Sequence, residues 1–239
     1  MGCYGGRLAG CCGVDAVKVL GIVAKTHDSG IALVEDGVPE LIFEEERFNR
    51  VKKTKKFPKQ SLAAARADFH LNIADVDVIT TPWDVRQLRR TALRLLTRRF
   101  PLSLSLLLPS THDSQQNQIM VLNSYLRHGL RKSFGCATLP PIVNVGHHES
   151  HAAVFFVSPF EEALVLVMDG YGDDSSSSAY LGRGTRLERK WSTEILNSVG
   201  LVYTFVTQHL GFAGFGDEGK IMALAAFGSA TYVNSFREV

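Results

Sequence analysis

The sequence has few cysteines and no long hydrophobic run, and each absence excludes a class of protein. Its 239 residues include four cysteines, and none of them belongs to a C-x-x-C pair. Neither a zinc ribbon nor a disulfide scaffold is therefore supported, and a reducing compartment such as the cytoplasm is expected. No window contains the roughly 18 to 20 consecutive apolar residues that a transmembrane helix requires, so no membrane partner is expected.

The first sixteen residues lack the features of a targeting signal. They are rich in glycine and begin with Met1-Gly2-Cys3, which invites a lipidation reading. The sixth residue is Gly6, however, where a myristoylation signal has Ser or Thr. The apolar stretch of a secretion signal is also missing. We expect residues 1–16 to form an unstructured leader.

A net charge of only +2 conceals an uneven distribution along the chain. Residues 47–132 hold 17 Lys and Arg against 5 Asp and Glu, and the remainder holds 9 against 19. With 45% apolar residues the chain is expected to fold, so the basic block lies on a folded protein. Solvated helix faces and a phosphate-bearing substrate both explain it. Nucleic acid is not favoured, because aromatic residues interleave poorly with these charges and no known binding motif is present.

The pattern of apolar residues predicts an α/β protein. Residues 17–162 are expected to form a first subdomain with a basic helical insertion at about 84–135, and residues 163–239 the start of a second. An Asp36-Gly37 turn favours a β-hairpin near the N-terminus. The sequence predicts strands at 17–24, 31–34, 38–43, 76–79, 142–145, 163–168, 179–181 and 187–191, and helices at 58–71, 86–99, 115–132, 149–157, 198–210 and 219–226.

One arrangement occurs twice in this pattern. An apolar strand, a polar group at its end, small hydroxyl and glycine residues, and a hairpin with an x-Gly turn appear at 17–43 and again at 163–191. This duplication resembles the actin, sugar-kinase and heat-shock ATPase superfold, a ribonuclease H-like fold of mixed sheets flanked by helices. Its hairpin loops present backbone N–H groups to nucleotide phosphates. An unrelated mixed sheet remains the alternative at this point.

The densest group of chemically reactive side chains is His147-His148-Glu149-Ser150-His151. If a helix begins here, His147 and His151 lie one turn apart on one face, which suits two ligands of one divalent metal. The H-E-x-x-H motif of zinc proteases does not fit, because its second histidine would fall on Ala152. The alternative is that these histidines only form hydrogen bonds near a helix N-terminus.

Asp169 ends the next apolar strand, about eighteen residues further on. A carboxylate at a strand end can reach the same metal, or phosphates beside it, and two imidazoles with one carboxylate suit Fe, Zn or Mn. The alternative is a structural aspartate that caps the turn at Gly170.

Two further stretches near the N-terminus carry candidate chemistry. His27-Asp28-Ser29 lies between the first strand and the hairpin, where a neutral histidine can take a proton from a hydroxyl nucleophile. Residues 44–52 pack acids against bases, and an Arg or Lys there could hold a phosphate. A solvated charged face is the alternative for this second stretch.

Together these stretches resemble the carbamoyltransferases of the nodulation and antibiotic-tailoring type. The family motifs occur here in family order between residues 17 and 228. The matches are H-D-S-x-A-A-L-V-x-D-G at 27–37, E-E-R-F-x-R-x-K at 45–52, H-H-x-x-H-A at 147–152, S-P-F-x-E-A at 158–163, D-G at 169–170, S-x-G-x-x-Y at 198–203 and G-x-E-x-K-x-M-x-L-A at 216–225.

The resemblance implies an enzyme that converts carbamoyl phosphate and ATP to carbamoyl adenylate and passes the carbamoyl group to an acceptor hydroxyl. It implies that His27 is the acceptor-side base and that Lys52 contacts carbamoyl phosphate. The metal and nucleotide site would include His147, His151 and Asp169. The residues expected to bind substrate and nucleotide beside these are Asp28, Ser29, Gly170, Gly172 and Lys220.

Some features depart from the family pattern. Members of the family are more than twice as long, so the chain is expected to be a fragment whose C-terminal partner region lies elsewhere. Ile31 stands in place of an alanine, Gly219 in place of an aromatic residue, and the leader has no counterpart. The alternatives are an enzyme like the tRNA threonylcarbamoyl transferases, which lack the H-D-S and E-E-R-F elements, or a non-catalytic module that binds nucleotide or metal.

Overall fold

The computed structural model describes residues 16–26, 28–98, 100–101, 119–214 and 216–238. The chain divides into two compact units. The first comprises Met1–Thr81 and Asp113–Val143, and the second Pro82–His112 and Asn144–Val239. The subdomain boundary expected after residue 162 remains a prediction.

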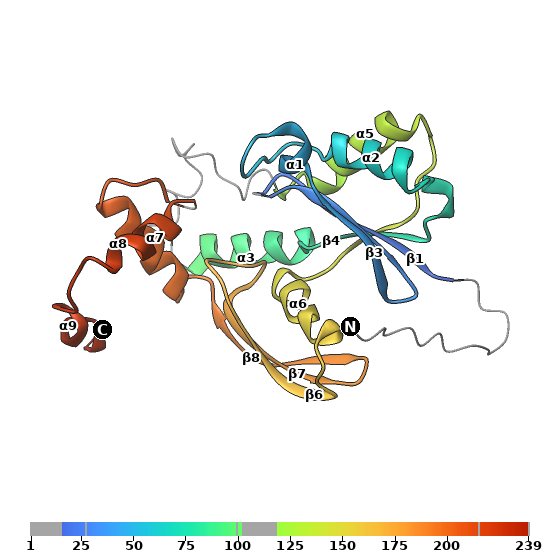
Figure 1. Ribbon diagram of the computed structural model, residues 1–239. Helices are drawn as coiled ribbons and strands as arrows, with labels where there is room; N and C mark the ends of the chain where they lie inside the picture. The colour runs from blue at the N-terminus through green and yellow to red at the C-terminus, as the bar shows by residue number, and fades with distance from the viewer. Residues whose placement is uncertain (1–15, 27, 99, 102–118, 215, 239) are drawn as a thin grey trace, which may run out of the picture. The chain divides into compact units, whose positions relative to one another are not determined.

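The first unit is built on a mixed sheet of five strands in the order β3-β2-β1-β4-β5 (Figure 1). The first three strands are antiparallel, and β4 runs parallel to β1. At the β2–β3 turn Asp36 and Gly37 have φ of 50° and 80°, the left-handed values that a tight two-residue hairpin requires. The strands are β1 (Lys18–Val23), β2 (Gly30–Glu35), β3 (Val38–Glu44), β4 (Val78–Thr81) and β5 (Ile142–Asn144).

The core of this unit lies between the sheet and its helices. Leu122, Leu126 and Leu130 repeat every four residues along one face of α5, and all three are fully buried. Burying each such leucine contributes about 1.5 to 3 kcal/mol. The helical elements are α1 (Glu45–Asn49), α2 (Lys59–Asp68), the short 3₁₀ helix η1 (Ile73–Asp75) and α5 (Leu122–Phe134).

Two helices of this unit differ from their expected bounds. The helix expected at 58–71 ends at Asp68, because the chain reverses at His70, whose φ is 54°. The helix expected at 115–132 is described over Leu122–Phe134, and its first residues lie outside the described part. It ends at Gly135, whose left-handed conformation with φ of 67° is a common helix stop.

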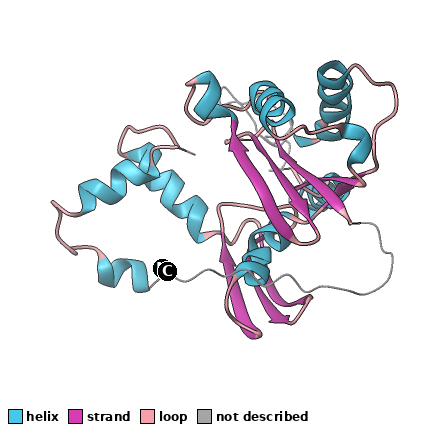
Figure 2. Ribbon diagram, turned by 45° about the vertical axis from the view of Figure 1, so that its right-hand side comes forward, coloured by secondary structure: helices cyan, strands magenta, loops and turns pink. Residues whose placement is uncertain are grey.

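The second unit contains a three-stranded antiparallel sheet with the order β6-β7-β8 (Figure 2). A small apolar cluster of Ala152, Val167 and Tyr180 packs the sheet against α6. The elements are β6 (Glu162–Met168), β7 (Ser175–Arg183), β8 (Arg186–Glu194), α3 (Val85–Arg98), α6 (His147–Ala152), the 3₁₀ helix η3 (Ala153–Val157), α7 (Val199–His209), α8 (Glu218–Ala225) and α9 (Val233–Arg237).

The strand expected at 179–181 is longer than predicted at both ends. Strand β7 begins at Ser175, and Ser175, Ser176 and Ser178 are almost completely buried. Their hydroxyls bond to one another and to neighbouring side chains and carbonyls, so serine is tolerated in a buried strand. The hairpin turn that follows falls on residues 184–185, so Gly184 is its first residue and not, as in the expected x-Gly turn, its second.

The expected α/β class is confirmed, and three antiparallel strands do occur twice, as β1-β2-β3 and β6-β7-β8. The two basic helices fall in different units, α5 in the first and α3 in the second. No described helix combines the length and apolar character that a bilayer span needs.

Candidate metal centre

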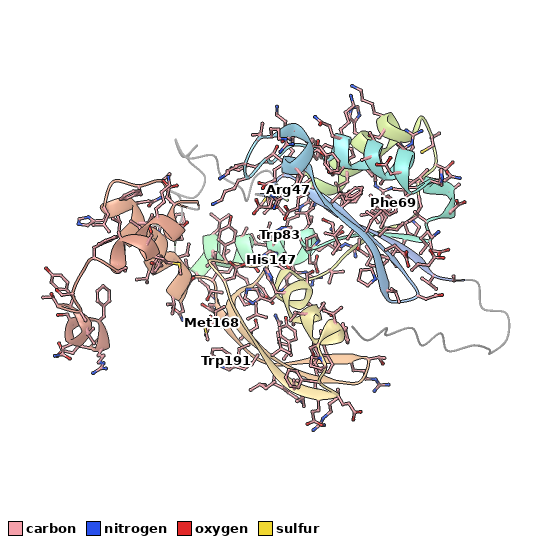
Figure 3. The ribbon with its side chains drawn as sticks, in the orientation of Figure 1. Arg47, Phe69, Trp83, His147, Met168 and Trp191 are labelled. Carbon is pink, nitrogen blue, oxygen red and sulfur yellow. The ribbon has the colours of Figure 1, made fainter. Side chains whose placement is uncertain are left out.

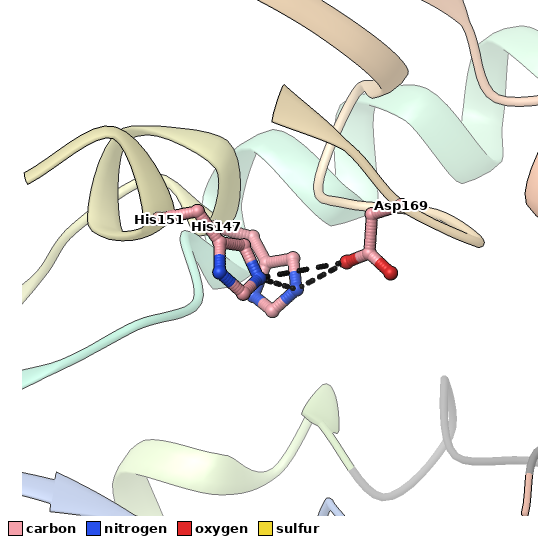
Figure 4. A group of neighbouring side chains, drawn as sticks. All are labelled: His147, His151 and Asp169. Carbon is pink, nitrogen blue, oxygen red and sulfur yellow. Dashed lines mark hydrogen bonds and ion pairs between the residues drawn. The ribbon is translucent and has the colours of Figure 1, made fainter. Parts of the chain in front are cut away.

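Three side chains of the second unit converge at one point (Figure 4). His147 and His151 lie one turn apart on α6, and Asp169 directly follows β6. Asp169 Oδ2 lies 2.9 Å from His147 Nε2 and 3.6 Å from His151 Nε2, and the two Nε2 atoms are 3.3 Å apart. The structure therefore brings together the three residues that the sequence assigned to a metal.

The geometry of these three atoms suits one divalent ion without rearrangement. A circle through them has a radius of about 1.9 Å, and bonds from a metal to histidine nitrogen or carboxylate oxygen are about 2.0 to 2.2 Å long. A point at bonding distance from all three atoms therefore exists just outside their plane. Within the described residues, this is the group of three that meets the spacing of a metal site.

The protonation of His147 also favours a cation at this point. Its Nδ1 lies 3.0 Å from the carbonyl oxygen of Pro82, and because a carbonyl only accepts, Nδ1 carries the proton and donates it. In the neutral ring, Nε2 then presents a lone pair toward the Asp169 carboxylate, 2.9 Å away. Two acceptors at this distance repel unless a proton or a metal ion lies between them.

Asp169 is held in its charged form. Burial opposes its ionisation, but the imidazoles of His147 and His151 beside its Oδ2, together with the backbone N–H of Gly170, outweigh burial and hold the pKa of Asp169 well below its usual range. A carboxylate that stays ionised is available to a metal at any physiological pH.

The orientation of His147 is fixed by Trp83 and Pro82, which no sequence motif indicated. The indole of Trp83 stacks on the His147 ring with centroids 3.9 Å apart and an angle of 18° (Figure 3). Trp83 is 5% exposed, so its ring is fixed in place. Their position directly after β4, at a strand end, was the one available sequence signal.

His148 and Asp173 lie behind the ligands and are also buried. Burial lowers the pKa of His148 to about 4, with repulsion from His147 acting in the same direction, so its imidazole is neutral. Its Nδ1 lies 2.8 Å from the hydroxyl of Ser178 in β7. Burial raises the pKa of Asp173 to about 6, although backbone N–H groups partly compensate. Both residues line a polar cavity of about 290 Å³ together with His147 and Arg189.

Gly170, Gly172 and Lys220, expected to contact nucleotide, also lie in the second unit. Gly172 approaches the ring of His148 so closely that an added Cβ would lie 2.8 Å from its Cδ2. This contact gives Gly172 a packing role. Lys220 lies on α8 and forms an ion pair of 2.7 Å with Asp217. The assignment of these residues to a nucleotide stays a prediction.

Asp28, Ser29 and Lys52, expected to contact substrate, belong to the first unit, and His27 lies outside the described residues. The loop before β2 and the loop after α1 are joined by a backbone hydrogen bond, in which the Ser29 N–H donates to the Thr54 carbonyl at 3.0 Å. Ser29 itself is fully buried. The non-glycine residues of these loops that adopt left-handed φ values are Lys25, Asp28, Arg50 and Lys53.

Such strain costs about 1 to 3 kcal/mol per residue and tends to gather at functional sites. Arg50 is the C-cap of α1, where a left-handed residue commonly ends a helix, so the binding role of Ser29 and Lys52 stays a prediction. The sequence did not reveal the strain, because all four residues are of types that usually adopt negative φ.

Comparison with known proteins identifies the family. The family model "Carbamoyltransferase N-terminus" matches residues 18–238. The chain belongs to this family. As a family member it carries the H-H-x-x-H-A histidines and Asp169 on the elements described above.

Named relatives are much longer than this chain. An uncharacterized protein of Synechocystis, sll1178, is 35% identical over 90% of the chain and 35% of its own length. The nodulation protein NolNO of Sinorhizobium fredii is 32% identical over 84% of the chain and 28% of its own length. The nodulation protein NolO of Bradyrhizobium diazoefficiens is 41% identical over 35% of the chain and 15% of its own length. The chain spans about a third of the length of the first two relatives.

Proposed function

We propose that this chain carries the metal-holding part of an ATP-dependent carbamoyltransferase. The observation that carries the proposal is the group of His147, His151 and Asp169, whose ligand atoms meet at distances that suit one divalent ion. Membership of the carbamoyltransferase N-terminus family supports it. The donor set suits Fe, Zn or Mn. When bound, such an ion would supply Lewis-acid polarisation of a substrate oxygen.

The proposed reaction joins carbamoyl phosphate, ATP and an acceptor hydroxyl. Water releases phosphate from carbamoyl phosphate, and an oxygen of the resulting carbamate attacks the α-phosphorus of ATP. Carbamoyl adenylate forms as pyrophosphate leaves. The acceptor hydroxyl then attacks the carbamoyl carbon, AMP leaves, and the hydroxyl proton passes to a base, which we propose is His27.

The remaining residues of the chain would bind the anionic parts of these substrates. Lys52 would donate to the phosphate of carbamoyl phosphate, and charge-assisted bonds of this kind contribute about 1.5 to 3 kcal/mol. Asp28 and Ser29 would shape the loop beside it. Gly170 would leave room for nucleotide phosphates beside Asp169, Gly172 would keep the adjoining turn close to His148, and Lys220 would contribute a positive charge.

The metal assignment is tested by substitution of both histidine ligands. The purified chain is expected to bind about one equivalent of Co²⁺, and the His147→Ala/His151→Ala variant none, because two of its three ligands are lost. The matched control is His128→Ala/His209→Ala, which removes two exposed histidines from α5 and α7. Isothermal titration with Co²⁺ measures the stoichiometry. Equal binding by the chain and the first variant would overturn the assignment.

The reaction is tested separately by following pyrophosphate. Release of pyrophosphate from ATP is expected to depend on carbamoyl phosphate, and the dependence is expected to disappear in His147→Ala/His151→Ala. Because this chain is proposed to be only the metal-holding part of the enzyme, the assay uses the chain completed with its C-terminal region. Metal binding without such a dependence would then contradict the catalytic proposal and favour a non-catalytic binding module.

A further inference from the structure

Asp173 lies next to the candidate metal centre, but both of its carboxylate oxygens accept hydrogen bonds from backbone amides. It is 4% exposed. Oδ2 accepts the backbone N–H of His147 at 2.6 Å, and Oδ1 accepts the backbone N–H of Asp84 at 3.0 Å. Because both oxygens are engaged by amides, Asp173 is a structural tie between two segments. It is not one of the three ligands.

The two amides belong to the two segments that hold the His147 ring. His147 is the first residue of α6, so its N–H has no partner inside the helix and needs an external acceptor. Asp84 comes directly after Pro82 and Trp83 in the chain. The Pro82 carbonyl accepts from His147 Nδ1, and the Trp83 indole stacks on the His147 ring. The Asp173 carboxylate therefore joins the backbone of His147 to the Pro82–Asp84 segment, which orients the His147 side chain.

The same loop also supplies the third ligand. Asp169 and Asp173 lie four residues apart, and Gly172 between them packs against His148 of α6. His147 is thus contacted at its ring by Asp169 and at its backbone by Asp173. The Pro82–Asp84 segment is further anchored by Asn144, whose amide donates to the Trp83 carbonyl at 2.8 Å.

We infer that Asp173 is a positioning residue that sets the metal affinity of this centre, by fixing His147 between α6 and the Pro82–Asp84 segment. The inference rests on the proposed metal site. A side chain at this place must accept two hydrogen bonds from two different amides. A carboxylate does so with its two oxygens, whereas an asparagine offers one oxygen and places an NH₂ group against the second N–H.

Asp173→Asn tests the inference, with Asp174→Asn as the matched control. Asp174 is the adjacent carboxylate and is equally well bonded, but its partners are Ser175, Gln87 and Arg189. We expect Asp173→Asn to weaken Co²⁺ binding by about 10- to 100-fold, the usual effect of losing a partner that orients a ligand. It should also alter the visible absorption bands that report the coordination geometry of Co²⁺. Asp174→Asn should leave both unchanged.

Thermal unfolding of the metal-free proteins separates positioning from general destabilisation. If Asp173 were only structural, both variants would lose stability and neither would change Co²⁺ affinity. Equal Co²⁺ affinity in the wild-type chain and Asp173→Asn would therefore overturn the inference while leaving the metal site intact. Absence of Co²⁺ binding in the wild-type chain would instead overturn the metal site, and the inference with it.

A second substitution covers the case in which Asp173→Asn shows no cooperative unfolding. Asp173→Ser removes the carboxylate and places no NH₂ group against either N–H. It still loses at least one of the two ties. We expect the same direction of change in Co²⁺ affinity, and wild-type affinity in Asp173→Ser would overturn the inference.

Discussion

The chain contains the same arrangement of three antiparallel strands twice, and the two copies are buried very differently. In the first, β1 lies in the middle of the five-stranded sheet, and its Leu20 and Ile22 are 0% and 1% exposed. In the second, β6 lies at an edge of its sheet. One face of β6 packs inward through Val167, whereas Leu166 and Met168 on the other face are 59% and 74% exposed. Figure 3 labels Met168.

The difference shows that β1 and β6 contribute differently to their units. Strand β1 is a core element, and six residues separate its end at Val23 from the next strand. Strand β6 is held by one apolar face and its ladder with β7, and Asp169 of the candidate metal centre directly follows its end. Strand β1 therefore stabilises the core of its unit, whereas the end of β6 positions a candidate ligand.

The largest expected effect is a loss of stability on truncating a leucine in the central strand β1, compared with one in the edge strand β6. Leu20→Ala should lower the free energy of unfolding by about 2 to 5 kcal/mol, because it leaves a cavity in a closed core. Leu166→Ala removes the same atoms from an exposed face and should cost less than about 1 kcal/mol. Urea unfolding followed by far-ultraviolet circular dichroism measures both. Similar losses in the two variants would contradict the comparison.

An intermediate loss of stability is expected from substitution of Asp174, a hydrogen-bonded carboxylate in the second copy. Asp174 accepts two hydrogen bonds from Arg189 of β8 and one from Ser175. Burial alone would raise its pKa, but these bonds outweigh burial, so the pKa of Asp174 lies below its ordinary value of 3.8. The folded protein thus favours the ionised form. Its stabilisation is present above pH 3.8 and is lost as the pH falls through the lower folded pKa.

Asp174→Asn should accordingly lower stability by about 1 to 2 kcal/mol at pH 7, and by less as the pH falls below 4. Thermal unfolding of both proteins between pH 3 and 7 measures the gap. Glu162, exposed on β6 and paired with Arg183, provides the control, because Glu162→Gln should change stability little at any pH. A gap for Asp174→Asn that stays constant with pH would contradict the assignment.

The smallest effect concerns the hairpin turns, where the two copies agree. Gly37 and Gly184 both have left-handed φ values, 80° and 52°, and neither has an atom within 4 Å of an added Cβ. Gly37→Ala and Gly184→Ala should each cost about 1 kcal/mol, because the strain is confined to the turn. Thermal unfolding checks this, and a much larger loss at one turn would show that the surrounding sheet contributes.

Much of the fold was predictable because it depends on local pattern. Alternating apolar residues and the Asp36-Gly37 turn predicted the first hairpin, and the i, i+4 spacing of His147 and His151 predicted two imidazoles on one helical face. Strand β7 was predicted too short, because buried serines give no apolar signal. Their burial depends on hydroxyl partners supplied by other elements.

The sequence by itself determined which residues could act as ligands and that they lie at a helix start and a strand end. Only the tertiary structure decided that these ends meet within 3.6 Å, and that Trp83, Pro82 and Asp173 orient the first histidine. Periodicity reports the conformation of neighbouring residues. The contacts of His147 with residues 65 and 26 positions away depend on how the strand ends and helices pack in three dimensions.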